Sequence, residues 1–265
     1  MSLTASLNRV LLVDGTNIVM RYAHAMASQS VAEPDNPASS ADRERVASAC
    51  VKAIRECAKA ALCGYAVVAF DSRDSWRKKL YPAYKAKRDV ATHRWSEALR
   101  SACEANKIFT LSCDGFEADD IIATLDRRIG ERGMLRAVLS GDSDLLVLAS
   151  NECDVYQFGR KGEERFQRRS PEWIREKYGI ASPQQLHAYK AIVGESGEGL
   201  TGLDGYGPVK ARALIERWGS VDKLIESQAL TEANRERLAL MLELVTLRTD
   251  VPIGAISPSD CRISD

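Results

Sequence analysis

The chain has 265 residues, of which 45% are hydrophobic and 28% are charged. That balance excludes a globally disordered chain and allows one large domain or two smaller ones. The formal net charge is zero, so a nucleic-acid partner can be inferred only from where the charges lie. No apolar run reaches the roughly 18 residues of a membrane span, and the N-terminus lacks a secretory-signal pattern, so we expect a cytoplasmic protein without a membrane partner.

Cysteines are scattered along the chain, and no two of them form a CxxC pair. An odd, dispersed set is typical of reduced thiols in an intracellular protein and argues against a disulfide framework or a zinc site. The seven positions are Cys50, Cys57, Cys63, Cys103, Cys113, Cys153 and Cys261.

Strands and helices alternate along the first part of the chain. Short apolar runs predict strands, and apolar residues spaced near 3.6 predict helices. Strands are expected at 9–14, 65–70, 107–111 and in the LRAVL segment before residue 140, and helices at 43–62, 95–106 and about 116–132. Residues 28–42, rich in Ser, Ala, Pro and Asp, predict a loop. The alternation predicts an α/β domain with a mostly parallel sheet.

The strand pattern fades beyond about residue 170. Residues 170–193 and 205–247 have the pattern of helices joined by a glycine-rich turn. We therefore divide the chain into an α/β domain at 1–168 and a helical domain at 169–265.

Acidic residues follow three of the predicted strands. Asp14 and Asp71 each come directly after an apolar run, and Asp142 and Asp144 follow the LRAVL run two residues apart. Because sites gather at the carboxyl ends of parallel strands, we expect these side chains to lie together. Taken alone, a pair of aspartates two apart is also common in turns.

The predicted helix in GFEADDIIATL begins with Glu117, Asp119 and Asp120. The simplest role for these acids is capping, since acids in a first turn satisfy free N–H groups. Seven carboxylates at one sheet edge, however, repel one another and must take up protons or bind cations. Oxygen ligands without His or Cys suit two Mg²⁺ or Mn²⁺ ions, a usual means of splitting a phosphodiester.

A basic stretch lies beside these acids, at residues 73–94. Its basic residues outnumber two acids, and the rings of Trp76, Tyr81 and Tyr84 are interleaved with them. Lys and Arg neutralise phosphates and aromatic rings stack on unpaired bases, which favours nucleic acid. The alternative is a solvated helix face with its aromatic residues packed inward. The basic residues are Arg73, Arg77, Lys78, Lys79, Lys85, Lys87, Arg88 and Arg94.

Several segments in a fixed order carry a family resemblance: LLVDGTNIVMR, VVAFDS, YPAYKAKRD, GFEADDIIATL, VLSGDSDLLVL and GYGPVKA. Together they resemble the 5′-nuclease family, which includes phage flap endonucleases and the 5′-nuclease domain of bacterial DNA polymerase I. The resemblance implies a PIN-like α/β fold with a helical arch and a C-terminal helical domain that contains a helix-hairpin-helix element. It also places the family's metal-site acids at Asp14, Asp71, Glu117, Asp119, Asp120, Asp142 and Asp144.

The resemblance also implies roles for the basic stretch. Lys85 would stabilise developing negative charge at the scissile phosphate, Tyr84 would stack on the terminal base, and Arg88 would hold a phosphate. We expect further DNA contacts from Arg77, Lys78 and Lys79.

The segment GLTGLDGYGPVKA resembles the family's helix-hairpin-helix, which grips duplex DNA and often binds K⁺. Gly202, Gly205 and Gly207 permit a tight turn. Pro208 suits the first position of a helix whose free N–H groups face a phosphate, and Lys210 adds charge there. The alternative is a plain glycine-rich connection between helices.

One segment departs from the family, which usually carries GDxSDN before this turn. This chain reads GESGEG at 194–199, so Glu195 and Glu198 stand where two metal-site aspartates are usual. The charge is kept, but each carboxylate moves by one methylene. We expect at least one of these glutamates to face the acidic site, and a second ion that binds more weakly than the first.

The sequence thus predicts a two-metal 5′-3′ exonuclease or flap endonuclease. We expect a monomer that acts on DNA with 5′ ends, flaps or branches, alongside a replication polymerase, and in the host cytoplasm if a phage encodes it. Two alternatives remain open: a PIN-type ribonuclease, and a DNA-binding relative that has lost second-metal function. Comparing the cleavage of 5′-flap DNA with that of single-stranded RNA tests the ribonuclease alternative. Measuring turnover in Mg²⁺ or Mn²⁺ tests the DNA-binding alternative.

Overall fold

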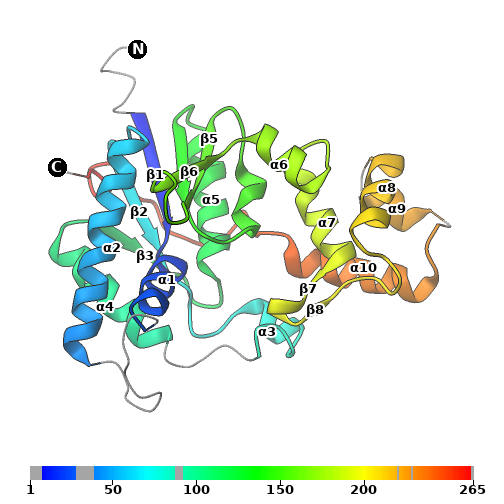
Figure 1. The fold of residues 1–265 in the computed structure, drawn as a ribbon, viewed down its shortest axis with the longest axis horizontal. Helices are drawn as coiled ribbons and strands as arrows, with labels where there is room; N and C mark the ends of the chain where they lie inside the picture. The colour runs from blue at the N-terminus through cyan, green and yellow to red at the C-terminus, as the bar shows by residue number, and fades with distance from the viewer. Residues whose placement is uncertain (1–7, 28–38, 87–91, 220, 228, 264–265) are drawn as a thin grey trace.

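The computed structural model describes residues 8–27, 39–86, 92–219, 221–227 and 229–263 (Figure 1). Its centre is a six-stranded sheet with the order β3-β2-β1-β4-β5-β6. Neighbouring strands are parallel except for β5 and β6, which are antiparallel. The predicted α/β fold with a mostly parallel sheet is confirmed. The strands are β1 (Arg9–Asp14), β2 (Tyr65–Ala69), β3 (Phe109–Leu111), β4 (Leu135–Leu139), β5 (Cys153–Phe158) and β6 (Phe166–Arg169).

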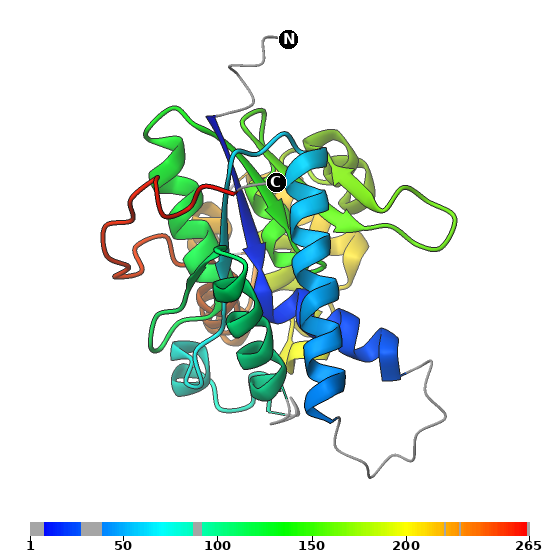
Figure 2. The same cartoon turned by 90° about the vertical axis from the view of Figure 1, so that its left-hand side faces the viewer.

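Alternating side chains in the central strands build one hydrophobic core on each face of the sheet. In β1, Leu11 and Val13 belong to the core under one set of helices, and Val10 and Leu12 belong to the opposite core. The period of two along a strand dictates this division. The first face is covered by α1 (Gly15–Ala27), α2 (Ser40–Ala60) and α4 (Thr92–Ala105), and α5 (Ala118–Gly130) covers the other. Figure 2 shows α2 lying across the first face.

The helices after the sheet extend the α5 side of the molecule, at the right of Figure 1. Leu186 and Ile192 of α7 and Leu238 of α10 belong to the same hydrophobic cluster as Ile121 of α5, so this core continues from the sheet into the helices. The division into two domains near residue 168 stays a prediction. These helices are α6 (Pro171–Tyr178), α7 (Leu186–Val193), α8 (Pro208–Trp218), α9 (Val221–Glu226) and α10 (Glu232–Val245).

The two long helices predicted in this half are interrupted. Gly179 ends α6 in the left-handed conformation, with φ of 65°, and Gly219 ends α8 in the same way, with φ of 69°. Glycine adopts this conformation without a Cβ penalty, which makes it the usual helix terminator. The helical pattern in the sequence therefore gives the right element type but too few elements.

The C-terminal segment leaves α10 and returns to the α/β part. Val251 is fully buried and its N–H donates to Oγ1 of Thr124 in α5 at 3.2 Å. The N–H of Ala66 in β2 donates to the carbonyl of Cys261 at 2.7 Å. The C-terminal segment of the predicted helical domain thus contacts α5 and β2 of the α/β part.

The seven cysteines all lie in the described part of the chain and form no disulfide. Burial raises the pKa of Cys63 and of Cys103 to about 12, which keeps these thiols unreactive. No described helix has the length and the apolar character that crossing a membrane requires.

Candidate metal centre and nucleic-acid cleft

The acids that follow β1, β2 and β4 meet at one edge of the sheet, because these three strands are adjacent and parallel. Asp14 ends β1, Asp71 follows β2, and Asp142 follows β4. Together with Asp119 in the first turn of α5, they line a cavity of about 580 Å³. The acids thus converge, as the strand pattern predicts.

Two groups of three carboxylates lie at this edge. Asp119, Asp142 and Asp144 each bring one oxygen within 4.8 Å of the others, and these are the oxygens a cation could bind. Asp144, Glu195 and Glu198 form a second group with the same spacing, so Asp144 belongs to both. Glu195 ends the short strand β7 (Gly194–Glu195), and Glu198 ends the 3-10 turn η4 (Ser196–Glu198) that follows. The structure therefore places both glutamates against the acids rather than in solvent.

The donor set of these groups fits a divalent cation. Oδ1 of Asp119 and Oε2 of Glu195 are buried without a hydrogen-bond partner, which is costly unless something else satisfies them. Burial and the charges of Asp14 and Asp142 raise the pKa of Asp119 well above its usual value. Burial is also the main cause that raises the pKa of Asp14 and of Glu195 to about 7. Crowded oxygens that resist ionisation side by side are suited to a hard cation such as Mg²⁺ or Mn²⁺.

The acids that begin α5 do not cap that helix with their own side chains. Glu117 is the N-cap residue, yet its carboxylate makes no capping bond. Oδ1 of Asp71 accepts the N–H of Ala118 instead, at 2.8 Å. The capping interpretation of Glu117 is therefore wrong. Its carboxylate belongs to neither group of three, and its oxygens accept from basic and phenolic side chains described below.

Lys190 in α7 is a site residue that sequence reasoning missed. Its side chain is buried, and Nζ forms an ion pair with Asp144 and a second with Oε1 of Glu195 at 2.8 Å. Although burial alone would lower the pKa of Lys190, the two carboxylates hold it above the usual value. The ammonium therefore neutralises part of the second carboxylate group. The available signal was a single lysine inside the apolar helix sequence LHAYKAIV.

Lys85 joins the acidic cavity to a more basic one. Its side chain is buried, and Nζ lies 3.1 Å from Oε1 of Glu117 and 3.2 Å from Oε1 of Glu198. Although burial alone would raise the pKa of Glu117, Lys85 and Arg77 lower it below the usual value. The lysine predicted to act at the scissile phosphate therefore sits at the mouth of the acidic site, held by two glutamates.

A second cavity, of about 520 Å³, adjoins the first. Lys85 and Asp71 line both cavities. Arg73, Lys78 and Arg94 line only the second. The acidic cavity could hold cations, and the basic residues of the adjoining cavity could neutralise the phosphates of a nucleic acid that passes over them.

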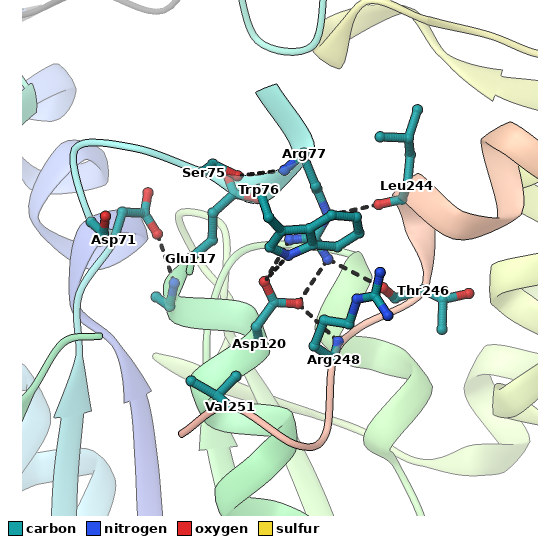
Figure 3. A network of polar contacts seen from close by, with 12 residues as sticks. Asp71, Ser75, Trp76, Arg77, Glu117, Asp120, Leu244, Thr246, Arg248 and Val251 are labelled. Carbon is teal, nitrogen blue, oxygen red and sulfur yellow. Dashed lines mark hydrogen bonds and ion pairs between the residues drawn. The ribbon is translucent and has the colours of Figure 1, made fainter. Parts of the chain in front are cut away.

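Two residues predicted for the site, Arg77 and Asp120, pair with each other in the interior (Figure 3). Arg77 is 2% exposed and Asp120 is fully buried. Nη1 and Nη2 of Arg77 donate to the two oxygens of Asp120 at 2.7 and 2.8 Å. The predicted DNA contact of Arg77 and the predicted metal ligation by Asp120 are therefore corrected. Each charge is already neutralised by the other, away from the cavity.

The aromatic part of the basic stretch is also buried. Tyr84 is 2% exposed and its hydroxyl donates to Oε2 of Glu117 at 3.1 Å. Stacking of this ring on a base, as predicted, is therefore wrong for this structure, because the ring has no free face. Lys78 and Lys79, on the exposed side of α3 (Trp76–Leu80), remain accessible to DNA. The predicted phosphate contact Arg88 lies outside the described residues.

In the glycine turn at 202–207, the backbone favours glycine at Gly202 and Gly205. A Cβ on Gly202 would lie 2.3 Å from the carbonyl oxygen of Ile192, so only glycine fits there. Gly205 has φ of 79°, and Gly207 precedes α8, which begins at Pro208. Nζ of Lys210 donates to the carbonyl of Gly205 at 2.7 Å and stays exposed. The turn therefore presents a helix start and a lysine to solvent.

The chain is similar to known proteins in sequence and in fold. DNA polymerase I of Thermus aquaticus is 31% identical over 259 residues, which are 92% of this chain and 29% of that protein. The chain thus spans less than a third of the curated relatives it matches. In fold, it is similar to a bacteriophage T5 flap endonuclease solved with DNA and metal ions, with a TM-score of 0.71 and 22% identity over 89% of this chain and 88% of the other. A T5 protein co-crystallised with metal ions gives a TM-score of 0.72 and 24% identity over 89% of each chain.

Residues 9–179 match the family model of the 5′-3′ exonuclease N-terminal resolvase-like domain. That segment contains β1 to β6, the cluster of Asp119, Asp142 and Asp144, and the basic cleft. The chain belongs to the 5′-3′ exonuclease family.

Proposed function

We propose that this chain is a metal-dependent, structure-specific 5′ nuclease that hydrolyses DNA phosphodiesters at free 5′ ends, flaps or branches. One observation carries the proposal: two carboxylate groups share Asp144, and Asp119 and Asp142 of the first group line a cavity that meets a basic cavity at Lys85. The relatives include DNA polymerases and a flap endonuclease solved with DNA, which supports DNA as the substrate.

Residues Asp119, Asp142 and Asp144 would hold one divalent cation, and Asp144, Glu195 and Glu198 a second. When bound, such ions supply an activated water and neutralise charge on the departing oxygen. The chain contributes the rest. Lys85 places an ammonium at the mouth of the pocket, where it would neutralise the scissile phosphate, and the basic cleft would hold the neighbouring phosphates.

We infer a second DNA contact at the glycine turn. The exposed start of α8 and Lys210 are suited to a duplex phosphate, and K⁺ is the ion that the resemblance suggests for the carbonyls of the turn. A monomer, working beside a replication polymerase, is the assembly that we propose. Mg²⁺ or Mn²⁺ is the divalent ion that the oxygen ligands favour.

Assays on 5′-flap, nicked, gapped and blunt DNA and on single-stranded RNA test the proposal. With Mg²⁺ or Mn²⁺ we expect cutting near the junction of flap DNA, leaving a 5′-phosphate. Faster cleavage of the RNA would favour the ribonuclease alternative. DNA binding without turnover in either ion would favour the non-catalytic one.

The second ion is expected to bind more weakly than the first, because it competes with Lys190 for Asp144 and Glu195. Glu195→Gln and Glu198→Gln should each raise the Mn²⁺ concentration for half-maximal activity by about tenfold or more. In calorimetric titrations with Mn²⁺ and without DNA, both variants should have a lower affinity than the wild type for the weaker of the two ions. Glu176→Gln, an exposed glutamate of α6, is the control. Unchanged titrations in both variants would remove these glutamates from the metal site.

A further inference from the structure

A single buried guanidinium connects three distant parts of the chain. Arg77 belongs to α3, within the basic stretch at 73–94, and its Nε donates to the carbonyl of Leu244 at 2.7 Å. Nη2 donates to the carbonyl of Thr246 at 3.2 Å, just beyond α10. Nη1 donates to Oε2 of Glu117 at 2.8 Å and to Asp120, both at the start of α5 (Figure 3). The basic stretch, the start of α5 and the end of α10 thus meet at one side chain.

Asp120 completes this junction from the other side. Its Oδ2 accepts the indole N–H of Trp76 at 3.0 Å, and its Oδ1 accepts the backbone N–H of Arg248 at 2.9 Å. With the two bonds from Arg77, the carboxylate is satisfied by donors from α3 and from the segment after α10. Figure 3 shows Trp76 and Arg248 beside this carboxylate, and the Arg248 guanidinium lies 4.4 Å from the centre of the Trp76 ring. These bonds fix α3, the start of α5 and the segment after α10 relative to one another.

Such a buried ion pair is weak evidence for stability, because the desolvation of both charges offsets their attraction. Its effect is geometric, since the planar guanidinium fixes the directions of all its hydrogen bonds. Lysine, a point charge on a flexible stem, can replace the charge but not these directions. The geometry therefore suggests a role in placing the groups to which Arg77 is bonded.

The next link leads into the cleft. Oε2 of Glu117 accepts from Arg77, and its Oε1 accepts from Nζ of Lys85 at 3.1 Å. The hydroxyl of Tyr84 also bonds Oε2, at 3.1 Å. The carboxylate of Glu117 is therefore bonded both to Arg77 and to the Lys85 ammonium, which lines both cavities. The orientation of Glu117, and with it Lys85, depends on a side chain that is itself fixed by the end of α10.

We propose that Arg77 is a positioning residue, which sets Lys85 through Glu117 and couples it to the segment that follows α10. This rests on the proposed nuclease function, and it assigns Arg77 no contact with DNA or metal. Since the glycine turn and α10 lie in the same helical part, DNA held there would be linked to the cleft through the carbonyls of Leu244 and Thr246.

Arg77→Lys tests the proposal, and Arg136→Lys is its matched control. Arg136 is also buried and pairs with a carboxylate of α5, Asp126, at 2.9 Å, but it lines neither cavity of the cleft. Both variants keep the positive charge and lose the planar guanidinium with its fixed hydrogen-bond directions. We expect Arg77→Lys to lower the single-turnover rate at saturating DNA by about 100-fold, as misplacement of a catalytic group does, with DNA affinity unchanged. Arg136→Lys should leave the rate within about twofold.

A double-variant cycle separates positioning from a general loss of structure. If Arg77 acts through Lys85, then Arg77→Lys added to Lys85→Ala should lower the rate by less than about twofold. If the double variant lost the product of the two single-variant rate factors, Arg77 would act independently of Lys85 and the proposal would be overturned. Equal losses of rate and of Tm in Arg77→Lys and Arg136→Lys would also overturn it.

Hydrogen exchange of the metal-free protein gives a readout that does not depend on cleavage. Arg77→Lys should speed exchange of the amides of Tyr84 and Lys85, which donate to the carbonyls of Tyr81 and Glu198. Arg136→Lys should not. If Arg77→Lys fails to fold, Glu117→Gln, which keeps the shape of the side chain, should show the same local change. Unchanged exchange at 81–86 would refute the coupling. Failure of wild-type protein to cut flap DNA would refute only the proposed function.

Discussion

Asp142→Asn is expected to abolish most cutting while DNA binding survives. Asp142 belongs to the first carboxylate group and lines the acidic cavity, so the amide removes a charged ligand from the middle of the site. We expect the single-turnover rate on flap DNA to fall by about 10³-fold, the loss typical of removing one group that stabilises transition-state charge. EDTA should have the same effect on the wild-type protein.

The matched control is Asp114→Asn, because Asp114 is an exposed aspartate on the loop that leads to α5. It should cut at the wild-type rate. DNA affinity measured in EDTA should be equal or slightly higher for Asp142→Asn, since a negative charge is lost near the phosphates. Full cutting in EDTA, or an Asp142→Asn variant as active as Asp114→Asn, would exclude the metal mechanism.

Lys85→Ala is the second variant with a large expected effect. The ammonium lies where the acidic and basic cavities meet, so its loss should lower the single-turnover rate by about 10²-fold with little change in DNA affinity. The change also leaves Glu117 and Glu198 without this counter-charge, so Tm is measured to separate a loss of fold from a loss of chemistry.

Lys210→Ala provides the contrast. Lys210 is exposed beside the glycine turn and is absent from the lining of both cavities. We expect weaker DNA binding and a salt dependence flatter by about one unit of slope, with the rate at saturation kept. If Lys85→Ala instead weakens binding and Lys210→Ala slows the saturated rate, the two assignments are exchanged.

The corrections to the predicted site have one physical cause. A sequence shows that Arg77, Tyr84 and Asp120 lie within a basic stretch and an acidic motif, but not which of their side chains is turned inward. Arg77 and Asp120 are two oppositely charged groups from segments more than forty residues apart, and they bury together because each satisfies the other. Composition and spacing carry no trace of such a pairing.

The sequence by itself determined the class of fold and the kind of chemistry. Apolar runs with the right period predicted β1, β2 and β4, and the acids directly after them had to meet because adjacent parallel strands end at one edge. Ordered motifs also predicted the family to which the chain belongs. Local patterns suffice for these features because the apolar period and the alternation of strands and helices can be read along the chain.

Only the tertiary structure decided how each charge is used. It turned Glu195 and Glu198 toward Asp144, paired Lys190 with both Asp144 and Glu195, and brought the C-terminal segment back against α5. It also separated Asp120, which is buried against Arg77, from the acids of the two carboxylate groups. These outcomes depend on contacts between segments far apart in the chain, where burial makes every unpaired charge costly and so selects one arrangement of partners.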